Sequence, residues 1–181
     1  MDGEDLQVKK YFNNKKNGLY VDVGAYHPIH RNNTKLLHDM GWEGINIDIS
    51  DFSIKLFEHL RPDDVNLNLA VSKTNGYVDM FYQKKLSQIL TIKKKIAENV
   101  FQGKIKSKKI LSKTLSQILN ESKYSERKID FLDVDVEGAD LDVLESLDFS
   151  KYSPELICVE YIGKNKNNSY MFNFLKNKNY E

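Results

Sequence analysis

The feature that most constrains the fold is the stretch of residues 19–26, an apolar run rich in valine that breaks at Gly24. Polar residues follow this glycine, and they open an amphipathic segment that ends at Gly41. This order predicts a strand, a tight turn and the start of a helix that Asn33 and Thr34 can cap. Gly24 allows the backbone to approach a ligand where a Cβ would intrude, and the helix start offers unpaired N–H groups to an anion.

A second predicted strand, residues 45–49, contains Asp48 near its end, where a carboxylate can accept hydrogen bonds from two ribose hydroxyls. Pyrophosphate-binding turns show the pattern G-x-G-x-x-G, whereas this turn carries one glycine. One glycine suits a ligand whose anion is a single carboxylate, such as the methionine end of S-adenosylmethionine. The single glycine therefore favours a site for S-adenosylmethionine over a site for a nicotinamide dinucleotide. The alternative is an ordinary strand–turn–helix in which the glycine only serves packing.

Strand and helix patterns alternate along the rest of the chain. They predict an α/β fold with an open, mostly parallel sheet and helices on both faces, as a single domain over residues 1–181. The predicted strands are residues 65–69, 77–82, 105–111, 129–136 and 156–159. Ligands of such sheets bind at the carboxyl ends of the strands. Five residues are expected at or just beyond those ends: Gly24, Asp48, Ala70, Asp135 and Glu160.

Residues 84–128 differ in charge from the remainder of the chain. They hold 13 Lys and Arg residues against 3 Glu, whereas the whole protein has a net charge of +1. We expect this basic segment to be a solvated insertion or a lid over the site. A second interpretation is a cationic platform for an anionic acceptor. Aromatic residues are sparse in it, which argues against stacking on RNA bases and against a nucleic-acid partner.

Several motifs resemble those of the FkbM-type S-adenosylmethionine-dependent methyltransferases. Residues 21–28, together with Asn33 and Thr34, resemble the first motif of that family, and residues 129–138 resemble its fourth-strand signature. Residues 3–6, 44–48 and 61–72 resemble the N-terminal element, the second strand and the third strand. The resemblance implies a Rossmann-like class I methyltransferase fold. That fold usually finishes with an antiparallel hairpin, of which residues 179–181 would be only the start.

The strand-end pattern and the resemblance together predict the residues that bind S-adenosylmethionine: Asp22, Gly24, Ala25, Asn33, Thr34, Asp48, Ile49, Ala70 and Asp135. Transfer of a methyl group from a sulfonium to an alcohol also requires removal of the hydroxyl proton, so a carboxylate or a histidine is expected within reach. The candidates are Asp135, Glu137 and His27, ahead of Glu160.

Asp133, Asp135 and Glu137 alternate in the sequence and are therefore expected on one face of an extended strand. Three like charges repel unless a cation or hydrogen bonds offset them. A sulfonium or an ammonium group can be that cation; a divalent metal is possible but is not predicted. In the alternative interpretation, Asp133 meets a neighbouring helix and Glu137 caps the next helix.

The sequence thus predicts an S-adenosylmethionine-dependent O-methyltransferase acting on a hydroxyl of a sugar, glycan or related metabolite, an acceptor class that only the resemblance implies. An RNA ribose methyltransferase and a catalytically silent nucleoside- or glycan-binding module are the alternatives. The single cysteine, Cys158, lies in an apolar run and excludes a disulfide within one chain. No long apolar stretch or signal-like N-terminus occurs, so we expect a cytoplasmic protein without a membrane partner. The oligomeric state stays open.

Overall fold

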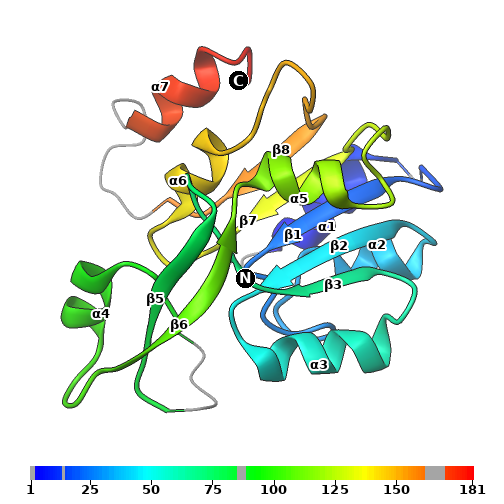
Figure 1. The fold of residues 1–181 in the computed structure, drawn as a ribbon. Coiled ribbons are helices and arrows are strands. Elements are labelled where there is room, and N and C mark those ends of the chain that lie inside the picture. The colour runs from blue at the N-terminus through cyan, green and yellow to red at the C-terminus, as the bar shows by residue number, and fades with distance from the viewer. Residues whose placement is uncertain (1–2, 14, 85–88, 162–169) are drawn as a thin grey trace.

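Five parallel strands form the central sheet in the order β3-β2-β1-β7-β8 (Figure 1). The computed structural model describes residues 3–13, 15–84, 89–161 and 170–181. The strands are β1 (Leu19–Val23), β2 (Glu43–Asp48), β3 (Val65–Asn68), β7 (Phe131–Val134) and β8 (Leu156–Val159). The strands flanking β1 are in register with it, with Tyr20 opposite both Gly44 and Phe131. The predicted parallel α/β fold is confirmed.

Helices cover both faces of this sheet, and its central strands are therefore buried on both sides. On one face, Leu19, Val21 and Val23 pack with apolar side chains of α5 (Leu115–Glu121) and α6 (Asp140–Glu145). On the other face, Tyr20 packs with side chains of α1 (Glu4–Tyr11) and α2 (Lys35–Asp39). Two more helices complete the layers: α3 (Asp51–Leu60), which packs against β2 and β3, and α7 (Tyr170–Lys176), which packs on the core that contains α5.

A second, smaller sheet lies beside the first and contains β4 (Ala70–Val71), β6 (Lys106–Lys113) and β5 (Gly76–Tyr82), in that order. β5 and β6 form an antiparallel ladder, and Met80 and Ile110 on its inner face pack against Ala70. The helix α4 (Lys94–Val100) lies between β5 and β6 in the sequence (Figure 1).

The basic segment is divided between these two parts of the molecule. Its first part forms α4 and β6, whereas Leu115, Ile118 and Leu119 of α5 are buried in the core of the five-stranded sheet. The prediction of one solvated insertion over residues 84–128 is therefore wrong for the part that begins at α5, because these apolar side chains cover the central sheet. Residues 85–88, at the start of the predicted lid, lie outside the described residues.

The end of the chain does not begin a sixth strand. After α7 the chain turns back, and the Tyr180 N–H donates to the Leu175 carbonyl at 3.1 Å. The Tyr180 hydroxyl donates to the Pro154 carbonyl at 2.6 Å, which holds this end beside β8. Of the helices in the described ranges, none is both long enough and apolar enough to cross a membrane.

Candidate active site

A cavity of about 750 Å³ opens at the carboxyl ends of the parallel strands. All five residues that the sequence placed at strand ends line it: Gly24, Asp48, Ala70, Asp135 and Glu160. Parallel strands end at one edge of the sheet, and the chain leaves that edge in both directions at the switch point between β1 and β7. The expected position of the site is thus matched by a cavity of a size that can hold a cofactor.

The lining of this cavity combines apolar and carboxylic side chains, which come largely from different elements. The residue after β2, the chain around β4 and the segment before α4 provide the apolar part: Ile49, Leu69, Ala70, Val71, Ile89, Leu90 and Ile92. Seven carboxylic side chains also line the cavity, and all but Glu4 and Asp48 come from β1, β7, β8 or the residues just after these strands: Glu4, Asp22, Asp48, Asp133, Asp135, Glu137 and Glu160. Among the described lining residues, Arg31 is the one with a fixed positive charge. The cavity therefore suits a ligand with an apolar ring system and positive charge.

Gly24 is required by the protein itself. Its φ is 88°, and a Cβ at this position would lie 1.8 Å from the Asp135 carbonyl oxygen. The Gly24 N–H donates to the Ile47 carbonyl at 2.8 Å, so the turn is held between β2 and the end of β7. The glycine thus serves close packing of two chain segments at the cavity, a different physical reason from the approach to a ligand that the sequence suggested.

Asp48 accepts hydrogen bonds from two backbone N–H groups. Its Oδ2 accepts from Tyr26 at 2.8 Å and its Oδ1 from Ser50 at 2.6 Å. Burial nevertheless raises the pKa of Asp48 to about 6. Each carboxylate oxygen has two lone pairs, so both can accept a further hydrogen bond from a ligand hydroxyl.

Thr34 does not cap α2, and neither does Asn33. The Thr34 hydroxyl lies 2.8 Å from Asp22 Oδ2, and no side-chain capping bond forms at the start of this helix. Asn33 Nδ2 donates instead to Asp133 Oδ1 at 3.3 Å. Asn33 lines the cavity, whereas Thr34 is fully buried and is not among the described residues that line it, so its cofactor contact stays a prediction.

The prediction that Asp133, Asp135 and Glu137 share one face of an extended strand is also wrong. β7 ends at Val134, and Glu137 has a φ of 52°, so the chain turns between these residues. Glu137 does not cap α6, because Ala139 occupies the N-cap position and no side-chain capping bond forms. The carboxylate of Asp140 instead accepts from the Val136 and Gly138 N–H groups, at 2.9 and 3.1 Å, and so holds the turn before the helix.

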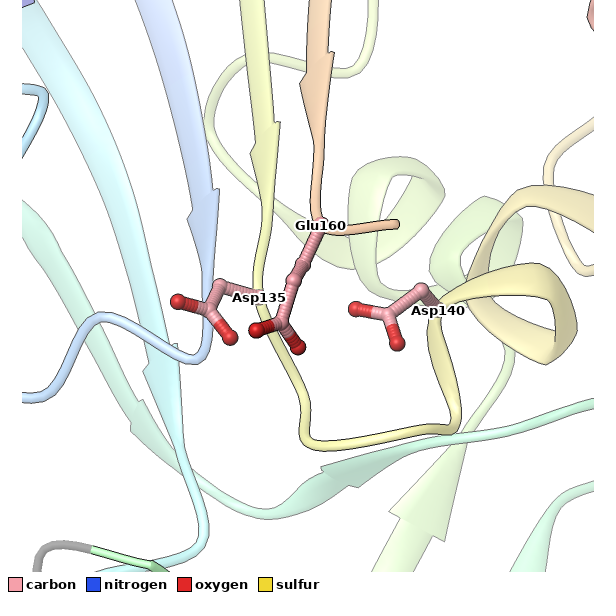
Figure 2. Close-up of side chains that lie close together, drawn as sticks. All are labelled: Asp135, Asp140 and Glu160. Carbon is pink, nitrogen blue, oxygen red and sulfur yellow. The ribbon is translucent and has the colours of Figure 1, made fainter. Parts of the chain in front are cut away.

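Three carboxylates from the ends of β7 and β8 and the start of α6 meet in the acidic part of the site. Oxygen atoms of Asp135, Asp140 and Glu160 lie within 4.8 Å of one another, with Glu160 between the two aspartates (Figure 2). Burial and the neighbouring carboxylates of Asp135, Glu137 and Asp140 raise the pKa of Glu160 to about 7. Its Oε2 is buried without a hydrogen-bond partner among the described residues. This group can take up a proton near neutral pH, or it can face a cation.

His27 occupies a different position. Its Nδ1 accepts hydrogen bonds from the Ile29 and His30 N–H groups, both at 3.1 Å, so the ring stabilises the turn after Tyr26. His27 is not among the described residues that line the cavity. Its role as a base stays a prediction.

The segment before α4 is tied to the acidic loop after β7. The Thr91 hydroxyl donates to the Glu137 carbonyl at 2.9 Å, and Thr91 also bridges to Phe81 of β5. Its neighbours Leu90 and Ile92 line the cavity. This part of the basic segment therefore forms a wall of the site.

The sheet order, the strand-end cavity and the acid at the end of β2 define a Rossmann-like α/β protein with a site suited to a nucleoside-containing ligand. A family model described as Methyltransferase FkbM domain matches residues 22–181. The chain therefore belongs to the FkbM methyltransferase family, and it is a methyltransferase. Separate comparisons with curated proteins and with solved structures gave no match. Membership of a methyltransferase family implies S-adenosylmethionine as the methyl donor in general.

Proposed function

We propose that this protein transfers the methyl group of S-adenosylmethionine to a hydroxyl of a sugar, glycan or related metabolite. The observation that carries the proposal is that the lining of one strand-end cavity is divided by element: the residues around β2, β4 and the start of α4, beside Asp48, are apolar, and most of the carboxylates come from β1, β7 and β8. S-adenosylmethionine has the same division, because a neutral nucleoside is joined to a positively charged sulfonium and an ammonium group.

In this proposal, Asp48 accepts the ribose hydroxyls, and Ile49 and Ala70 contact the base. Asp135 faces the amino group of the methionine part. Gly24 and Ala25 form the turn beside it, and Asp22 lies under that turn. The fit rests on the lining residues and on the free lone pairs of Asp48.

The acid group at the ends of β7 and β8 supports an alcohol acceptor. In the transfer, the acceptor O–H bond breaks as the new O–CH₃ bond forms, and the electron pair of the old C–S bond stays on sulfur. The proton passes to a carboxylate. Glu160 suits this role because its pKa of about 7 leaves part of it ionised at neutral pH and makes it basic enough to accept the proton. Asp135 and Glu137 stay candidates for the same step.

The cofactor is tested by calorimetric titration with S-adenosylmethionine and S-adenosylhomocysteine, with NAD as the control ligand. The variant Asp48→Asn removes a negative charge and one acceptor oxygen, and we expect it to weaken binding of both nucleosides. Asp51→Asn is the matched control, because Asp51 is exposed three residues later and pairs with Lys55. Saturable NAD binding in place of S-adenosylmethionine would refute the proposal.

The acceptor is tested by transfer of a radiolabelled methyl group to a set of neutral and acidic saccharides and to RNA, with and without magnesium. Labelled saccharide supports the proposal. Labelled RNA, with binding that weakens steeply with salt, would establish the ribose methyltransferase alternative. Cofactor binding without transfer to any acceptor would favour the silent binding module. The cytoplasmic location expected from the sequence stays a prediction.

A further inference from the structure

We infer that Arg61, a buried arginine outside the cavity lining, is a positioning residue for the turn that carries the cofactor. The inference rests on the proposed binding of S-adenosylmethionine. Arg61 follows the last residue of α3 and is 1% exposed. Its guanidinium lies under residues 24–34, the segment that joins β1 to α2 and provides much of the cavity lining.

Arg61 bonds this segment at three places. Its Nη1 donates to the Thr34 hydroxyl at 3.0 Å, and its Nη2 donates to Asn32 Oδ1 at 2.8 Å and to the Pro28 carbonyl. Nη1 also donates to the Tyr20 hydroxyl at 3.2 Å. One rigid, planar group with five N–H donors therefore fixes a segment that has no regular secondary structure of its own.

The effect of Arg61 reaches the cavity through the amide of Asn32. Because the amide oxygen of Asn32 accepts from Arg61, its Nδ2 must point the other way. There it donates to Asp22 Oδ2 at 2.9 Å and to the Ala25 carbonyl at 3.1 Å. Asp22, Ala25 and Asn32 all line the cavity. Arg61 thus sets the conformation of the turn from behind, without contact with the ligand.

The turn needs such a support because two of its residues other than glycine have left-handed backbone conformations. Tyr26 has a φ of 54° and Arg31 a φ of 51°, and neither is a glycine. Conformations of this kind persist only where surrounding contacts enforce them. On the cavity side Asp48 holds Tyr26, and on the buried side Arg61 holds Pro28, Asn32 and Thr34.

The guanidinium also balances buried negative charge. It is linked to Asp22 through Thr34 and Asn32, and to Asp64 through the Tyr20 hydroxyl. Burial raises the pKa of Asp22, and the nearby Arg61 charge opposes that rise. A lysine at position 61 would keep the charge, but it lacks the planar fork that reaches the three loop acceptors together. Arg61→Lys therefore separates the two roles of this side chain.

The test measures the Kd for S-adenosylmethionine by calorimetry, and the free energy of unfolding in urea, for wild type and Arg61→Lys. We expect the Kd of the folded variant to rise by about 10- to 100-fold, the effect that outer-shell partners have on metal sites. Arg127→Lys is the matched control. Like Arg61, Arg127 donates to a side-chain oxygen and to a backbone carbonyl, but these belong to Glu43 and Asn17, beside the start of β2 at the opposite edge of the sheet. Its Kd should equal that of wild type.

Asn32→Ala tests whether Arg61 acts on the turn through the amide of Asn32. If Arg61 acts through Asn32, the single variants weaken binding by similar factors, and Arg61→Lys adds little in the Asn32→Ala background. A folded Arg61→Lys with wild-type affinity would overturn the inference. If Arg61→Lys does not fold, wild-type affinity in Asn32→Ala overturns it instead.

Failure of the proposed function gives a different result, because wild type itself would then not bind S-adenosylmethionine. In that case hydrogen exchange still tests the positioning role. Faster exchange of the Tyr26 amide in Arg61→Lys, but not in Arg127→Lys, supports it, and equal exchange in both variants refutes it.

Discussion

Substitution of Gly24 by alanine has two energetic costs: the conformational cost of a positive φ and the steric cost of a Cβ. Comparison with Gly41→Ala separates them. Gly24 and Gly41 have nearly the same φ, 88° and 85°. A Cβ on Gly41 would meet no atom within 4 Å, whereas a Cβ on Gly24 would lie 1.8 Å from the Asp135 carbonyl oxygen and 2.7 Å from its carbon. Gly41→Ala therefore measures the conformational cost alone, about 1–2 kcal/mol.

Gly24→Ala adds a displacement of the chain to this cost. Real Cβ atoms essentially never approach another heavy atom more closely than 3.0 Å, so the turn and the end of β7 must separate by more than 1 Å. The Asp135 N–H to Val23 carbonyl bond of 2.9 Å and the Gly24 N–H to Ile47 carbonyl bond of 2.8 Å cannot both survive that movement. At about 1 kcal/mol for each bond that is lost, and with one or both lost, the total loss is about 2–4 kcal/mol.

Urea unfolding followed by circular dichroism gives both free energies, and calorimetry gives the affinity of each variant for S-adenosylmethionine. We expect Gly24→Ala to be less stable than Gly41→Ala by about 1–2 kcal/mol and to bind the cofactor poorly. Gly41→Ala should bind it as wild type does. Equal losses of stability in the two variants would refute the steric reasoning.

Three further predictions follow from the charges. With an acceptor in hand, Glu160→Gln should lower turnover by about 10²- to 10⁴-fold and remove the rise of activity with pH near 7, and an unchanged pH profile would exclude Glu160 as the base. Tyr20→Phe should cost about 1–2 kcal/mol in urea unfolding, because its hydroxyl donates to Asp64 and accepts from Arg61; no change would show that the bonds are dispensable. Without ligand, the free energy of unfolding should fall as the pH rises from about 4 to 7. The cavity carboxyls have raised pKa values in the folded state, so the folded protein binds more protons in that window. Urea titrations at several pH values measure the fall, and a rise would contradict it.

The position of the site could be predicted from the sequence because strand ends are local signals. An apolar run that stops at a glycine or an acid marks the end of its own strand, as at Gly24, Asp48 and Glu160. In a parallel sheet all such ends meet at one edge. The helices could be predicted for a similar reason, since Ser50 and Pro62 mark the beginning and end of α3 by short-range chemistry.

Side-chain partners could not be predicted in this way. Thr34 had the sequence of a helix cap, yet its hydroxyl bonds Asp22 and accepts from Arg61, which is far from it in the chain. The predicted strand over residues 129–136 also ends too late, because the end of β7 depends on its neighbour in the sheet. The alternation of acids continues beyond Val134, but the strand ends where its neighbour β1 ends, with Val23 opposite Val134. Asp140 was missed as a member of the acid group because only the turn after β7 brings it beside Glu160.

The pairing of β1 with β7 also decides when this protein can fold during synthesis. β1 and β2 are close in the sequence and can pair early, but the Leu19 N–H donates to Asp130 across 111 residues of chain. Until β7 leaves the ribosome, the second edge of β1 is unpaired, and α6, which covers one face of β1 together with α5, has not yet been made. The central strand is therefore made first and enclosed late, and we expect a nascent chain that stops before residue 130 to depend on chaperones.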